Sequence, residues 1–87
     1  MITSEQLEQI GTLTLEHAPS ESTLIMLREQ YPELHFTYCM DDDVVAAKPV
    51  YETEMFNLYL IDSRNHCLSF TQDQEIATGV VVAEIDE

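Results

Sequence analysis

Hydrophobic residues recur along the chain with two different periods, and the change from one to the other falls near residue 34. Between residues 3 and 18 the spacing is helical, and the apolar stripe consists of Leu7, Ile10 and Leu13 or Thr14. Thr3 or Ser4 can cap this helix, and Gln6 follows Thr3 at the spacing of a capping box. Pro19 comes directly after the pattern, so we expect the helix to end before it.

A second helix is predicted to begin at Ser20, a favourable cap that is followed by the acidic Glu21. Its apolar stripe comprises Leu24, Leu27 and Tyr31. Pro32 disfavours helical dihedral angles in the residue before it, so the helix should end there. The chain up to residue 32 is therefore expected to form a helical hairpin.

From residue 34 the period is two, which is typical of a strand with one buried face. In 34–40 the apolar side is made by Leu34, Phe36, Tyr38 and Met40. The opposite side carries His35, Thr37 and Cys39. Aspartate is depleted in strands and favoured in turns, so Asp41–Asp43 is predicted to end this strand.

A hairpin is predicted from Met55–Asp62 and His66–Thr71, joined by residues 63–65 with Asn65 in the left-handed position. The register that follows pairs Asp62 with His66, Ile61 with Cys67, Leu60 with Leu68, and Leu58 with Phe70. A slip of one residue would set apolar against polar side chains along the whole hairpin.

Two segments are ambiguous. Residues 44–54 contain Pro49 and should form a loop or an edge segment. The tail begins a helical pattern at Asp73, and we predict a helical segment there, with a final strand over the valines of 80–82 as the alternative.

The predicted fold class is α+β in a single small domain, 1–87: an N-terminal helical hairpin packed on an antiparallel sheet of about three strands, with a C-terminal helical or strand segment. The helices should cover the sheet face that carries Phe36, Tyr38, Phe56, Leu58, Leu60, Leu68 and Phe70.

Charge is the feature in which the composition is unusual. Asp and Glu number 17 against 3 Lys and Arg, which gives a formal net charge of −14. This charge opposes direct binding of nucleic acid, whose phosphates require Lys and Arg. It favours a protein partner with a basic surface, while mimicry of nucleic acid by the acidic side chains is a weaker alternative.

The N-terminal residues 1–11 lack the basic and apolar blocks of a signal peptide, and no run approaches the roughly 20 apolar residues that span a bilayer. We therefore expect a cytoplasmic protein that does not bind membranes, with Cys39 and Cys67 reduced. The oligomeric state is left open.

Cysteine and histidine on one predicted sheet face raise the question of a metal site. The possible ligands are His35, Cys39, His66 and Cys67, which would suit zinc or iron. Their spacing matches no compact motif, so an ordinary polar sheet face with free cysteines is the simpler interpretation. No Gly-rich loop or nucleophile elbow supports a catalytic Cys–His pair, and we expect a non-enzymatic protein without a cofactor.

The acidic run Asp41, Asp42 and Asp43 lacks the alternate ligands and the central glycine of a calcium loop. We interpret it as a solvated turn and as part of the surface that meets a basic partner.

Four segments taken together resemble a known family: His35–Val44, Phe56–Leu60, His66–Leu68 and Ala77–Gly79. Over roughly residues 20–86 the chain is similar to a small family of acidic, uncharacterised bacterial proteins found near nitrogen-fixation genes. The resemblance implies no activity. It implies an accessory role around nitrogenase or the assembly of its metal cluster, and it adds weight to the alternative of a metal or cluster carrier that uses the Cys/His face.

Overall fold

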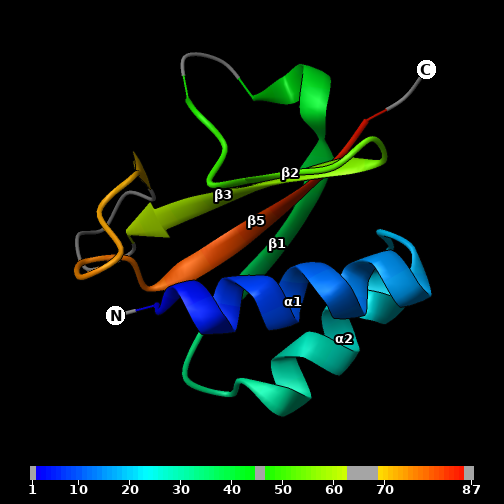
Figure 1. The fold of residues 1–87 in the computed structure, drawn as a ribbon, viewed down its shortest axis with the longest axis horizontal. Helices are drawn as coiled ribbons and strands as arrows, with labels where there is room; N and C mark the ends of the chain where they lie inside the picture. The colour runs from blue at the N-terminus through cyan, green and yellow to red at the C-terminus, as the bar shows by residue number, and fades with distance from the viewer. Residues whose placement is uncertain (1, 45–46, 63–68, 86–87) are drawn as a thin grey trace.

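The computed structural model describes residues 2–44, 47–62 and 69–85 and places two helices against one face of a five-stranded sheet (Figure 1). The helices come first in the chain: α1 spans Ser4–His17 and α2 spans Glu21–Gln30. The strands are β1 (His35–Met40), β2 (Tyr51–Glu52), β3 (Phe56–Asp62), β4 (Ser69–Thr71) and β5 (Gly79–Glu84), with the 3-10 turn η1 (Asp41–Asp43) directly after β1. The predicted α+β class is confirmed.

The sheet is mixed, in the order β1-β5-β3-β2, and β4 also pairs with β3. The central strand β5 runs parallel to β1, with Phe36 opposite Val80, and antiparallel to β3, with Leu58 opposite Val82. The prediction of an antiparallel sheet of about three strands is therefore wrong in the number of strands and in the direction of β1. The β1–β5 pair joins the middle of the chain to its end, and such a distant pairing leaves no local pattern.

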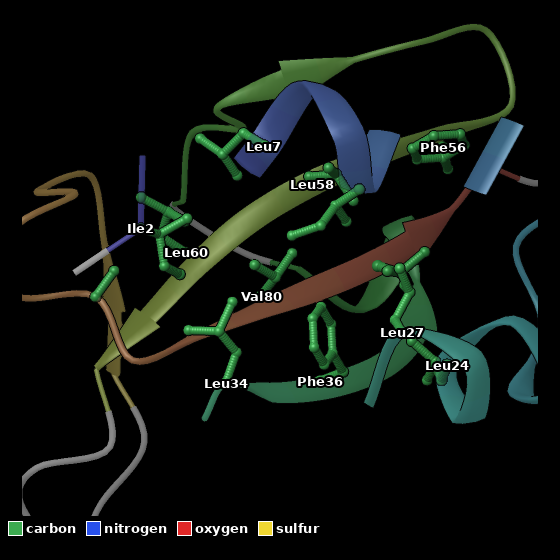
Figure 2. Close-up of a cluster of buried hydrophobic side chains, with 13 residues drawn as sticks. Ile2, Leu7, Leu24, Leu27, Leu34, Phe36, Phe56, Leu58, Leu60 and Val80 are labelled. Atoms are coloured by element: carbon green, nitrogen blue, oxygen red, sulfur yellow. The ribbon is translucent and has the colours of Figure 1, made fainter. Parts of the chain in front are cut away.

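The helices and the sheet enclose the main core (Figure 2). Its strand residues include Phe36, Phe56, Leu58, Leu60, Val80 and Val82, and its helix residues include Leu7, Ile10, Leu24 and Leu27. The apolar stripes predicted for both helices are confirmed. So is the predicted sheet face at Phe36, Phe56, Leu58 and Leu60, with Tyr38 half-buried at its margin.

The first helix begins as its sequence predicts. The Gln6 backbone N–H donates to Thr3 Oγ1 at 3.0 Å, and the Thr3 N–H donates to Gln6 Oε1 at 2.9 Å, which completes a capping box. Glycine is unfavourable in the interior of a helix, but steric crowding explains why Gly11 occupies this position. A Cβ atom at this position would lie 2.5 Å from the ring of Tyr51, so glycine lets α1 approach β2 closely.

The side of the sheet turned away from the helices, which we call the outer face, is also largely apolar. Tyr59, Ile61, Val81 and Ala83 are buried there. Val44 and Ala47, in the segment that follows η1, pack against them. Because both faces of β3 and β5 are covered, these strands have nearly continuous apolar sequences.

The predicted register of the last hairpin is wrong. Leu60 lies opposite Thr71 and Ile61 lies opposite Phe70, so Phe70 is on the outer face and not in the main core. Loop length fixes the register of a hairpin, and the prediction assumed a loop of residues 63–65, whereas the paired residues Asp62 and Ser69 enclose 63–68. The predicted positions of Asn65, His66, Cys67 and Leu68 lie outside the described residues.

The predicted helical segment in the tail is also wrong, and the alternative of a final strand is confirmed. The Ala77 N–H donates to the Asp73 carbonyl at 3.1 Å, which closes one turn, and the Thr78 N–H then donates to the Ile61 carbonyl at 2.9 Å. The chain enters β5 at Gly79, where a Cβ atom would lie 2.5 Å from the carbonyl oxygen of His35. The helix-start signal therefore produces a turn that ends where the strand joins the sheet.

Candidate functional site

The three aspartates after β1 occupy different environments. η1 directs Asp41 toward β3, where its Oδ1 accepts hydrogen bonds from Asn57 Nδ2 at 3.1 Å and from Tyr59 Oη at 2.8 Å. Asp41 is half-buried, whereas Asp42 and Asp43 are exposed. One member of the predicted acidic surface is thus tied to the sheet, and the other two face solvent.

Tyr59 connects Asp41 to the outer face. Burial raises the pKa of Tyr59, and its hydrogen bond to Asp41 raises that pKa further, so the hydroxyl remains a donor at neutral pH. The ring of Tyr59 meets the ring of Phe70 edge to face, with 5.7 Å between the centroids and 70° between the planes. Asp41 therefore holds Tyr59 in place, and Tyr59 supports Phe70.

His35 and Cys39 lie on the same face of β1, as predicted, but they are too far apart to act together. Four residues along a strand correspond to about 13 Å at a rise of about 3.3 Å per residue. Bonds from zinc to its ligands are only about 2.0–2.3 Å long, so these two side chains cannot bind one ion. The same separation excludes a hydrogen-bonded nucleophile made by Cys39 and His35.

The other two candidate ligands, His66 and Cys67, lie outside the described residues. Within 2–44, 47–62 and 69–85, the structure contains no group of 3 or more His, Cys, Asp or Glu residues arranged to hold a metal ion. The predicted metal site therefore stays a prediction.

Two groups on β1, the Cys39 thiol and the Tyr38 hydroxyl, are held in their protonated forms. Burial raises the pKa of the Cys39 thiol, and the carboxylates of Asp43 and Asp41 raise it further. The thiolate is the reactive form of cysteine, so Cys39 is a weak nucleophile at neutral pH. The Tyr38 hydroxyl donates to the Glu84 carboxylate, and this bond together with burial raises the pKa of Tyr38 to about 12.

A cavity of about 300 Å³ opens on the outer face beside Cys39. We call it the Phe70 pocket, and its lining is made by Thr37, Cys39, Asp43, Val44, Ile61, Phe70 and Val81. Most of these side chains are apolar, and Asp43 supplies a charge. A concave apolar surface with a small number of polar groups is the usual form of a binding site.

The sequence interpretation missed this pocket because it placed Phe70 in the main core. The signal that could have revealed it was the pair Tyr59 and Ile61. These large side chains alternate with the core residues of β3, so they point to the opposite face of the sheet and form a second apolar surface there.

The chain matches the model of a family of unknown function (DUF6129) over residues 5–85. This match spans most of the chain, so the chain belongs to that family. Comparison with curated proteins and with solved structures gives no match. Among the residues that the structure describes, no helix is both long enough and apolar enough to cross a membrane.

Proposed function

We propose that this member of a family of unknown function is a non-enzymatic, cytoplasmic interaction protein that docks on the basic surface of a protein partner. The observation that carries the proposal is the exposure of its acidic side chains. They come from all parts of the described chain: Glu5, Glu8, Glu16, Glu21, Glu29, Glu33, Asp42, Asp43, Glu52, Glu54, Asp73 and Glu75. A surface of one sign attracts an oppositely charged partner over a distance and speeds their encounter.

The two described cations compensate little of this charge. Arg28 turns its guanidinium toward β1, where Nη2 donates to the Phe36 carbonyl at 2.9 Å, and Lys48 is the other. The formal net charge of −14 therefore acts against the stability of the isolated protein through self-repulsion. A basic partner would relieve that repulsion, which favours the complex.

Two further observations support a role without catalysis. His35 and Cys39 are separated along β1, and the pKa of Cys39 is raised by burial and by the acids beside it. The resemblance found in the sequence adds a biological context, in which the partner would belong to nitrogenase or to the assembly of its metal cluster.

A pull-down from native lysate at graded salt tests the proposal. We expect the tagged protein to recover a partner with a basic surface at about 0.05 M NaCl and to lose most of it at about 0.5 M, because salt screens exposed charges. Replacing Glu5, Glu8, Glu16 and Glu21 with Gln should lower the recovery at low salt. The control Leu15→Ser changes an exposed helix residue without changing the charge and should leave recovery unchanged. Recovery that does not depend on salt, or on the glutamates, would contradict the proposal.

A further inference from the structure

We infer that the Phe70 pocket receives one apolar side chain of the partner, and that Lys or Arg residues beside this side chain meet Asp42 and Asp43. The inference rests on the proposed function and deepens it, because it says where on an acidic protein the basic partner is anchored and by what chemistry.

The size and lining of the pocket suit a single side chain. Its volume of about 300 Å³ lies at the lower end of the range of roughly 300–1,000 Å³ for small-molecule sites. Two of the lining residues, Ile61 and Val81, are 3% and 5% exposed and belong to the paired strands β3 and β5, so the sheet holds this part of the lining in place. An aliphatic or aromatic side chain placed there would lose its contact with water without requiring the sheet to move.

The side chain of Phe70 contributes little to the packing of the core. It belongs to neither of the two core clusters and is 46% exposed, although β4 places it firmly opposite Ile61. Its ring is held by Tyr59, and Tyr59 is held by Asp41. A large aromatic side chain that is already fixed before binding loses little conformational freedom when a partner covers it, and such residues often dominate binding energy.

The charge around the pocket selects the kind of partner. Asp43 is part of the lining and Asp42, next to it in the chain, is exposed, whereas Lys48 lines a different cavity that also borders Phe70. A second copy of this chain is a poor occupant, because a symmetric contact through this face would bring together two surfaces with the same acids and two molecules of charge −14. An apolar side chain flanked by basic residues satisfies both the pocket and its rim.

The test uses three short peptides as probes: a phenylalanine flanked by lysines, the same peptide with serine in place of phenylalanine, and the phenylalanine peptide with glutamates in place of the lysines. Amide chemical shifts of the full-length protein report where each peptide binds. We expect the first peptide to shift the amides of Thr37, Cys39, Val44, Ile61, Phe70 and Val81, and to bind about tenfold more tightly than the serine peptide. The glutamate peptide should not bind.

Cys39 supplies a second readout. In a Cys67→Ser background the rate at which an alkylating reagent labels Cys39 measures access to the pocket. The phenylalanine peptide should slow this labelling, and the serine peptide should not.

Matched variants separate the pocket from the rest of the surface. Phe70→Ser should abolish the preference for the phenylalanine peptide, whereas Ile25→Ser, a similar loss of an exposed apolar side chain on α2, should preserve it. Thr37→Leu changes an exposed position at the pocket lining and should block entry, which keeps the test valid if Phe70→Ser fails to fold.

Each other outcome has a definite meaning. Equal binding of the phenylalanine and serine peptides, with shifts spread over the acidic residues, would overturn the inference and leave the proposed function standing. Binding of the glutamate peptide would remove the requirement for a basic partner. If neither lysine peptide binds, the inference fails, and the pull-down at graded salt then decides the proposed function by itself.

Discussion

At the scale of single residues, the run Asp41–Asp43 shows what a sequence pattern can and cannot assign. Three adjacent aspartates predict the end of a strand, and β1 does end at Met40. The pattern cannot say which carboxylate turns inward, because that depends on Asn57 and Tyr59, which are distant in the chain and adjacent only after β3 has paired. Residue identity therefore predicts the turn, and tertiary structure determines that Asp41 is the aspartate whose side chain turns toward the sheet.

This difference leads to a matched prediction. Asp41→Ala removes the acceptor of both hydrogen bonds and leaves the hydroxyl of the buried Tyr59 without this partner, so the free energy of unfolding should fall by about 1–3 kcal/mol. Asp42→Ala removes the same charge from an exposed position and should leave stability unchanged or slightly higher. Urea unfolding measures both, as a change in midpoint at constant slope. Equal effects of the two substitutions would show that Asp41 acts only through its charge.

At the scale of helices and strands, the elements with a clear sequence period were predicted well and the element without one was not. α1 and α2 have apolar stripes and N-caps, and β3 alternates its core residues with those of the outer face. In β5 both Val80 and Val81 are buried, so its sequence is a continuous apolar run that periodicity cannot assign to helix or strand. The Phe70 pocket was not predicted for a related reason. Its shape depends on the pairing of Ile61 with Phe70, and the assumed loop length gave a different register.

The edge of the sheet at β1 permits a prediction about Arg28. The His35 N–H donates toward β5, to the Thr78 carbonyl, so the alternation of the strand directs the Phe36 carbonyl to the other edge, where Arg28 Nη2 donates to it at 2.9 Å. Arg28→Ala should lower the free energy of unfolding by about 1 kcal/mol. Lys48→Ala makes the same change in net charge at an exposed position and should have a smaller effect. If the two variants shift the urea midpoint equally, the loss of stability in Arg28→Ala is due to the lost charge and not to the lost hydrogen bond.

At the scale of the whole molecule, composition alone gives the net charge, and the structure gives the distances across which the charged side chains repel one another. The molecule measures 32 × 28 × 21 Å. The screening length is about 30 Å at 0.01 M salt and about 10 Å at 0.1 M. At the lower concentration each carboxylate is therefore repelled by acids across the whole protein, and at the higher one mainly by its neighbours.

The melting temperature should accordingly rise by several degrees when NaCl is increased from about 0.01 M to about 0.1 M, because 1 kcal/mol corresponds to about 4–8 °C in a domain of this size. Replacing Glu5, Glu8, Glu52 and Glu54 with Gln should raise the melting temperature at low salt and flatten its dependence on salt, since these side chains are exposed. KCl in place of NaCl should give the same curve, which separates screening from the binding of a particular cation. A melting temperature that does not change with salt would mean that the acids are compensated within the fold, and it would remove the self-repulsion that a basic partner is proposed to relieve.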